Sequence, residues 1–204
     1  PSKAIKDSNF LPSVVLPWVN TITLPEFILD RGFSIDSAFR WGFVVSDDGS
    51  LVIPGNSLDG QMVGWVCRKM PGKMPKYVYS TGLEKSKVLF GADKITMMNN
   101  FLVIVEGSLD AIWLDQNGFD AVAILGGYIS KRQFDIIEEL RPTEVVTCFD
   151  NDDVGRRLTG DVFDYFSNRR LVSCANLPKN KKDIQDVKNK SEIQQIIKNR
   201  TIIY

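Results

Sequence analysis

The chain has 204 residues, 44% of them hydrophobic, and its 25 basic and 25 acidic residues give a formal net charge of zero. This length suffices for one large domain or two small ones, and any affinity for nucleic acid has to come from local patches. Histidine is absent, and the cysteines Cys67, Cys148 and Cys174 lie in apolar runs without a Cys-x-x-Cys pair. The composition therefore excludes zinc fingers, histidine-dependent triads and histidine metal sites.

No apolar run approaches 18 residues and no signal peptide is recognisable. We therefore expect a soluble, cytoplasmic protein without a membrane partner. The chain begins with Pro1 rather than Met, so it is expected to be a processed or cut piece of a longer protein.

The first half of the chain shows short helices followed by strands and turns. Helices are expected over residues 23–33 and 34–43, the second capped by Ser34 or Asp36. Three strands separated by Gly- and Pro-containing turns follow, at 51–55, 61–69 and 76–80. This part is predicted to be a small α+β subdomain.

After residue 100, buried strands alternate with helices. Continuous apolar runs predict strands at 101–107, 120–127, 144–150 and 171–178. Apolar residues at helical spacing predict helices at 108–117, 131–140, 153–170 and 191–199. The alternation is typical of an α/β domain, a parallel sheet with helices on both faces. The predicted boundaries are 1–95 for the α+β subdomain, 96–190 for the α/β domain and 191–204 for a C-terminal helix.

Acidic residues follow three of the four predicted parallel strands. Glu106 ends the first strand, Asp150 and Asp152 end the third, and Asp183 follows the fourth. Ligands of such sheets gather at the carboxyl ends of the strands. Carboxylates without histidine or cysteine suit a hard cation, so the four acids predict a site for Mg²⁺, with Mn²⁺ as an alternative.

Each signal also has an ordinary structural explanation. Glu106 could be a solvated residue at a strand end, and Asp150 or Asp152 could form a turn or cap a helix. Arg156 could lie in a solvated first helical turn, balance the acidic charge or contact a phosphate. The charged run 179–190 could be a solvated loop, or its lysines could gather around a triphosphate.

The stretch from residue 68 to residue 87 is basic, with six Lys or Arg residues against one acid and two tyrosines among them. Such a surface can hold a nucleic-acid backbone and stack bases. The alternative is a basic hairpin on the small subdomain.

Together these residues resemble the Toprim domain, and more narrowly the catalytic core of DNA primases of the bacterial and phage type. Toprim domains carry a Glu after the first strand, an Asp-x-Asp after a later strand and often a further Asp. The matching stretches here are VEGSLDA with Glu106, FDNDDVGR with Asp150 and Asp152, and KKDIQD with Asp183. The resemblance covers residues 25 to 190, and the order of the motifs is specific.

The preceding subdomain separates primases from other Toprim proteins. The stretches LVIPGNSLDGQMVGWVCRK, PKYVYSTG and KSKVLFG resemble primase motifs in sequence and order. The resemblance implies that Arg68, Lys76, Tyr77 and Lys85 face nucleotide or template, with Lys76, Lys85 and Arg68 lining a cleft between the subdomains. The full predicted nucleotide- or template-binding set adds Lys87, Gly126, Gly127 and Arg156.

The sequence also departs from the bacterial pattern. Asp48, Gly49 and Ser50 stand where bacterial primases usually place arginines, and Tyr79 stands where Asn is common. Gly127 stands where Thr is frequent, and the Gly-Gly pair looks phage-like. No zinc-binding module and no helicase-contact region is evident, so we expect both partners, a zinc-binding module and a replicative helicase, outside this chain.

The resemblance implies an enzyme, a DNA-directed RNA polymerase of primase type. It would make short RNA primers on a single-stranded DNA template from ribonucleoside triphosphates by metal-assisted nucleotidyl transfer, in the host cytoplasm if phage-encoded. Asp150, Asp152 and Asp183 would hold the metal. Glu106 would either complete the metal site or assist deprotonation of the attacking 3′-hydroxyl. The predicted catalytic residues are Glu106, Asp150 and Asp152.

Three alternatives remain open. A Toprim nuclease would use the same carboxylates for hydrolysis. A phosphatase of the haloacid-dehalogenase type would use the DNDDV stretch, although that motif normally ends the first strand of its fold and here ends the third. A primase-like nucleic-acid-binding module would keep the fold with little activity alone, which the missing zinc module and missing arginines favour.

Overall fold

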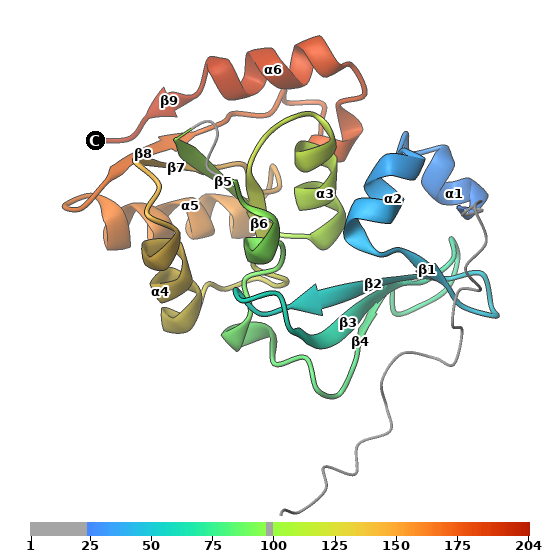
Figure 1. Cartoon of the computed structure of the whole chain (residues 1–204). Coiled ribbons are helices and arrows are strands. Elements are labelled where there is room, and N and C mark those ends of the chain that lie inside the picture. Colours follow the sequence, from blue (N-terminus) through green and yellow to red (C-terminus); the bar gives the residue numbers. More distant parts are fainter. Residues whose placement is uncertain (1–23, 97–99) are drawn as a thin grey trace, which may run out of the picture. The chain divides into compact units, whose positions relative to one another are not determined.

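The computed structural model describes residues 24–96 and 100–204 (Figure 1). Main-chain contacts divide the chain into two units. The first holds the described residues up to Gly55 together with Met62–Leu83, and the second holds Asn56–Gln61 and Glu84–Tyr204. The boundaries at residues 95 and 190 rest on sequence motifs and stay a prediction.

The first unit consists of two short helices and a four-stranded sheet. The helices are α1 (Glu26–Leu29) and α2 (Ile35–Trp41). The strands, in spatial order, are β1 (Val44–Val45), β2 (Leu51–Asn56), β3 (Met62–Arg68) and β4 (Tyr77–Tyr79). Of the two predicted caps of α2, Ser34 is the one used, because its side chain accepts a hydrogen bond from the backbone N–H of Ser37.

The second unit is built on a five-stranded sheet with the order β6-β5-β7-β8-β9. Its strands are β5 (Phe101–Val105), β6 (Ala121–Ala123), β7 (Glu144–Thr147), β8 (Leu171–Cys174) and β9 (Thr201–Ile202). The first four pair in parallel, as predicted. β9 pairs antiparallel with β8, so the C-terminal segment contributes a strand as well as the expected helix.

Helices connect these strands and cover the sheet. They are α3 (Ser108–Gln116), α4 (Lys131–Leu140), α5 (Asp153–Phe166) and α6 (Lys190–Lys198). Three short 3₁₀ helices complete the unit: η1 (Lys85–Lys87), η2 (Ala92–Lys94) and η3 (Ile184–Asp186). Among the described residues, no helix is long and apolar enough to cross a membrane.

The main hydrophobic core of this unit lies between the sheet and the helices α4 and α5. Alternate strand residues such as Leu102, Ile104 and Val145 pack there against residues of the two helices, among them Phe134, Ile137, Leu158, Val162 and Phe166. Strand residues alternate between the two faces of a sheet, so the residues that alternate with these ones along the strands point to the opposite face of the sheet. Every residue of α3 from Ser108 to Leu114 is buried.

The strand order creates a switch point at β5. From β5 the chain moves to β6 on one side, and it then returns to β7 on the other side of β5. In α/β sheets, ligands bind beyond the carboxyl ends of the strands at such a point. The strands end earlier than predicted, β5 at Val105 and β7 at Thr147. Glu106 and Asp150 therefore lie on the loops just beyond the switch point.

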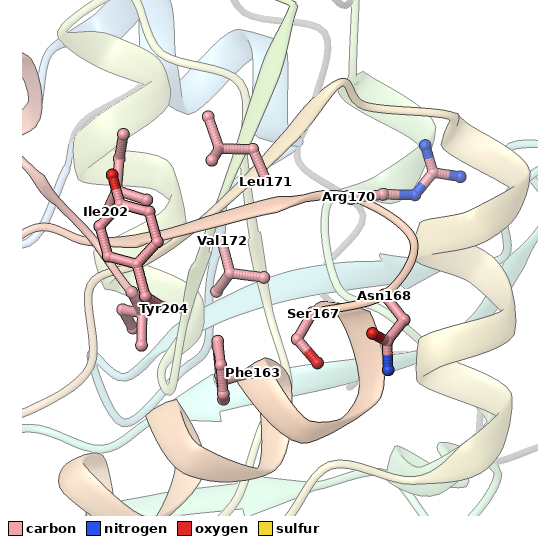
Figure 2. A pocket seen from close by; sticks show the side chains of 9 residues that line it. Phe163, Ser167, Asn168, Arg170, Leu171, Val172, Ile202 and Tyr204 are labelled. Carbon is pink, nitrogen blue, oxygen red and sulfur yellow. The ribbon is translucent and has the colours of Figure 1, made fainter.

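A cavity of about 400 Å³ lies at the opposite, amino-terminal end of β8. Figure 2 shows that Leu171 and Val172 of β8 line it together with Phe163 of α5 and Tyr204. Ligands of parallel sheets bind at the carboxyl ends of the strands, so this cavity is separate from the candidate site.

Candidate metal centre at the ends of β5 and β7

Glu106 and Asp150 are brought together by strand pairing. β5 and β7 pair in the register Ile104 with Thr147, so both chains leave the sheet side by side. The backbone N–H of Asp150 then donates a hydrogen bond of 3.2 Å to Oε1 of Glu106. The two residues, 44 positions apart in sequence, form the centre of the predicted site.

Asp152 lies in the turn after Asp150 and begins α5. Its backbone N–H donates to the carbonyl of Asp150 at 2.8 Å. Its side chain accepts a hydrogen bond of 3.0 Å from the N–H of Gly155. The helix-cap explanation of Asp152 is therefore correct, and the same carboxylate adds negative charge beside Glu106 and Asp150.

Gly155 allows this turn to close. The sequence alone did not single out this residue. A Cβ atom at this position would lie 2.0 Å from the carbonyl oxygen of Asp150 and 3.1 Å from Cβ of Phe149. Any larger residue would push the first turn of α5 away from Asp150. The signal in the sequence is a glycine three residues after the capping aspartate.

The loop after β8 supplies Asp183, the fourth acid of the predicted set. Asp183 begins η3 by accepting a hydrogen bond of 3.2 Å from the N–H of Asp186. The loop is joined to the β7–α5 turn because the N–H of Asn151 donates to the carbonyl of Lys182 at 2.7 Å. Lys182 Nζ lies 3.4 Å from Oδ2 of Asp150. The structure thus adds a basic residue next to the acids.

The pKa values show the concentration of negative charge. Burial, followed by the charges of Asp150 and Asp152, raises the pKa of Glu106 to about 7, against an opposing effect of Lys182. Burial also raises the pKa of Asp150, with Lys182 opposing and Asp183 adding to the rise. Nearby carboxylates that each make the other harder to ionise favour a bound cation.

Asp110 of α3 is a further acid next to this group. It is buried and accepts hydrogen bonds from the N–H of Gly107, at 3.2 Å, and from Nε2 of Gln185. Burial, followed by the charge of Asp183, raises its pKa to about 7. A Cβ atom on Gly107 would lie 2.6 Å from Oδ2 of Asp110, so the absence of a side chain at Gly107 leaves room for this hydrogen bond.

The donor set suits a hard cation. Within the ranges 24–96 and 100–204, no three Asp, Glu or Cys side chains form a ready-made ligand cage. A zinc-type closed site therefore does not fit. Mg²⁺ is commonly held by one or two carboxylates and completes its shell with waters and substrate phosphates. The adjacent oxygen donors of Glu106 and Asp150 fit that mode of binding.

A cavity of about 110 Å³ opens beside Asp150, beyond the carboxyl ends of β7 and β8. Its lining includes Asn151, Gly155, Arg156 and Asn176. Arg156, predicted to contact nucleotide, also pairs with the exposed Asp153. Such surface pairs are weak, so the guanidinium is available at the rim of this cavity.

The other predicted nucleotide-binding residues of the second unit lie on two segments. Gly126 and Gly127 follow β6, and the carbonyl of Gly127 accepts a hydrogen bond from the Arg157 guanidinium. Lys85 and Lys87 belong to η1 and are exposed, and Lys87 pairs with Glu84 at 2.8 Å. Their predicted role stays a prediction.

In the first unit, the structure brings Arg68, Lys76 and Tyr77 together. The guanidinium of Arg68 lies 5.3 Å from the ring centroid of Tyr77, and Nζ of Lys76 lies 5.7 Å from it. Arg68 is 7% exposed and donates to the carbonyls of Lys69 and Lys76. Burial lowers its pKa. Lys76, by contrast, is exposed.

The departure at Asp48 has a structural role. Asp48 accepts hydrogen bonds from the Ser46 hydroxyl and the Ser50 N–H, and it pairs with Lys69 at 3.0 Å. These contacts, led by the Ser46 bond, hold its pKa below the ordinary range. The turn before β2 therefore carries an aspartate that is bonded within the turn and to Lys69 after β3.

Residues 103–188 match the family model described as Toprim-like. The chain is 36% identical over 141 residues to the DNA primase of Synechococcus elongatus, covering 63% of this chain and 20% of that protein. It is 30% identical over 189 residues to the DNA primase of Thermotoga maritima, covering 87% of this chain and 33% of that protein. The chain thus spans a third or less of the length of these two relatives.

Solved structures share the fold. The DnaG catalytic core matches with a TM-score of 0.72 and 20% identity, over 86% of this chain and 72% of that one. The zinc-binding and RNA polymerase domains of the Aquifex aeolicus primase match with a TM-score of 0.71 and 21% identity, over 87% and 56%. The expected fold and the resemblance to Toprim primase cores are both confirmed.

Proposed function

Because this chain carries a Toprim-like domain within the fold of a DNA primase catalytic core, we propose that it synthesises short RNA primers. In this proposal it uses a single-stranded DNA template and ribonucleoside triphosphates, and it transfers nucleotides with the help of Mg²⁺ or Mn²⁺. The similarity to two bacterial DNA primases at 30% identity or more supports this assignment.

The observation that carries the proposal is the adjacency of Glu106 and Asp150 at the switch point of the sheet. Two partly buried carboxylates there, with Asp152 and Asp183 close by, create a negative site that a divalent cation would neutralise. Nucleotidyl transfer needs such a cation, because the triphosphate is itself strongly negative.

In this mechanism a bound Mg²⁺ supplies charge stabilisation on the phosphorus and on the departing pyrophosphate. Asp150, Asp152 and Asp183 would hold the metal. Glu106 either completes the metal site or accepts the proton of the attacking 3′-hydroxyl. Without metal the pKa of Glu106 is raised to about 7 by burial and by Asp150, so a nearby cation would favour its charged form.

The basic residues are assigned to nucleotide and template. Lys76 and Tyr77 of the first unit are suited to a phosphate backbone and a stacked base, and Arg68 fixes their position from below the surface. In the second unit, nucleotide or template binding is assigned to Lys85, Lys87 and Arg156 and to the backbone of Gly126 and Gly127. A zinc-binding module and a replicative helicase are the proposed partners, in the cytoplasm.

The test is primer synthesis on single-stranded DNA with labelled ribonucleotides and Mg²⁺ or Mn²⁺. Asp150→Asn is expected to lower the rate by at least about 100-fold, because it removes a charge that holds the cation. The exposed Asp153→Asn is the matched control and should retain activity. An equal rate in wild type and the Asp150 variant would contradict the proposal, provided both show the same thermal unfolding.

The same reaction separates the alternatives. A nuclease of this fold would shorten the template without ribonucleotides and would leave no labelled product. A phosphatase of the haloacid-dehalogenase type is disfavoured because DNDDV follows β7, the third parallel strand in chain order. A non-catalytic binding module would bind the template and make no RNA at any concentration.

A further inference from the structure

Lys182 is held next to the acidic site by its own backbone. Its carbonyl accepts a hydrogen bond of 2.7 Å from the N–H of Asn151, and its N–H donates one of 2.9 Å to Oδ2 of Asp186. The side chain is 68% exposed and ends 3.4 Å from Oδ2 of Asp150. The backbone position is therefore fixed, while the flexible side chain can change its partner.

A divalent cation and the Lys182 ammonium compete for the same oxygens. Asp150 is one of the acids proposed to hold the metal, and its Oδ2 already faces a positive charge. Like charges at this distance repel. An Mg²⁺ held by Asp150 would therefore displace the ammonium from Oδ2, while the fixed backbone would keep the side chain of Lys182 beside the acidic site.

A metal-bound triphosphate would place anionic oxygens in that same space. We propose that Lys182 is a nucleotide-binding residue that neutralises Asp150 in the metal-free protein and passes to the triphosphate when Mg²⁺ and nucleotide bind. The proposal rests on the proposed function, because the triphosphate is the substrate of that reaction. It gives a role to one lysine of the charged run 179–190.

This role predicts effects of opposite sign on two ligands. In Lys182→Met, the competing charge is lost, so Mg²⁺ alone should bind about fivefold more tightly. ATP in saturating Mg²⁺ should bind about tenfold more weakly, because a charge-assisted contact to phosphate is lost. A lysine that only stabilised the loop would weaken both ligands together.

The experiment is calorimetric titration of the whole chain, first with MgCl₂ and then with ATP at saturating MgCl₂. Lys182→Arg keeps the charge and should keep both affinities near wild type. Lys179→Met removes an exposed charge from the same loop and should change neither. Thermal unfolding of all variants without ligand verifies that they are folded.

The outcomes separate the two proposals. Tighter Mg²⁺ binding with weaker ATP binding in Lys182→Met supports the role of Lys182. Unchanged or weaker Mg²⁺ binding, or unchanged ATP binding, overturns it. Asp150→Asn is titrated in parallel. If it loses Mg²⁺ binding while Lys182→Met behaves as wild type, only the role of Lys182 fails. If Asp150→Asn binds Mg²⁺ like wild type, the metal centre and the proposed function fail too.

Discussion

Gly155 and Gly160 lie in the same helix, α5, with opposite surroundings. A Cβ atom on Gly155 would collide with the backbone of Asp150, whereas one on Gly160 would meet nothing within 4 Å. Gly155→Ala is therefore expected to lower the free energy of unfolding by about 3 kcal/mol, at the upper end for overpacking. Gly160→Ala should raise it by about 0.5–1 kcal/mol, because alanine favours the helix.

Urea denaturation of the two variants tests this prediction. Since the clash at Gly155 involves Asp150, the first variant should also bind Mg²⁺ more weakly, and the second should bind it like wild type. Equal stability changes of the same sign would show that the turn after β7 is not packed as described.

The raised pKa of Glu106 predicts a pH dependence of stability without metal. Its folded value of about 7 lies above the ordinary 4.5, so between these values the folded chain binds more protons than the unfolded chain. The contribution of Glu106 to stability is then fully present below about pH 4.5 and is lost as the pH rises through 7. The Tm in EDTA should fall across this window, and less steeply in Glu106→Gln. Asp110, also near 7, leaves a remaining slope. Parallel curves for the two proteins would contradict the assignment.

Position relative to the strands predicts Glu106, Asp150, Asp152 and Asp183 as site residues, and the structure brings Glu106 and Asp150 together beyond β5 and β7. The pattern of acids at strand ends is visible in one dimension. The contacts of Lys182 and Gln185 are not, because each depends on how a loop folds back over residues far away. Gln185 meets Asp110 across 75 positions, and no periodicity encodes such a contact.

Among the elements, the C-terminal segment joins the sheet by the pairing of β9 with β8 and also by an ion pair. Arg200 lies just before β9 and donates two hydrogen bonds of 2.6 Å to the carboxylate of Glu144 on β7. Burial alone raises the pKa of Glu144, but the bonds from Arg200 and Ser173 hold it below its ordinary value. The guanidinium also lies 4.5 Å from the ring centroid of Phe101. The contact thus joins residues of β5, β7 and β8.

Arg200→Ala is expected to lower the free energy of unfolding by about 2–3 kcal/mol, since it leaves a mostly buried carboxylate without its partner. Lys198→Ala removes an exposed cation two residues earlier and should change stability by less than about 0.5 kcal/mol. Chemical denaturation at pH 7 measures both. Similar small effects for the two would mean that the ion pair contributes little.

The long elements were predictable and the short ones were not. The helices α4 and α5 and the four parallel strands follow from periodicity and apolar runs. β1 and β9 have two residues each, too few to show any period. The predicted strands also ran too far, because apolar residues such as Cys148 and Phe149 continue beyond the end of β7 while still buried.

At the scale of the whole molecule, strand–helix alternation after residue 100 was enough to predict the α/β class. The strand order and the resulting switch point at β5 needed the structure. Because the chain has 25 acidic and 25 basic residues, any affinity for nucleic acid has to come from local basic patches. Basic residues of the stretch 68–87 belong to both units, and their joint role in holding a template stays a prediction.

The proposed function depends on a divalent cation binding at the ends of β5 and β7. The most direct measurement is the anomalous scattering of crystals of this chain grown with MnCl₂. The expected result is a manganese peak bound by Asp150, with Glu106, Asp152 or Asp183 completing the protein ligands. Manganese bound only elsewhere, or no bound manganese at a saturating concentration, would contradict it.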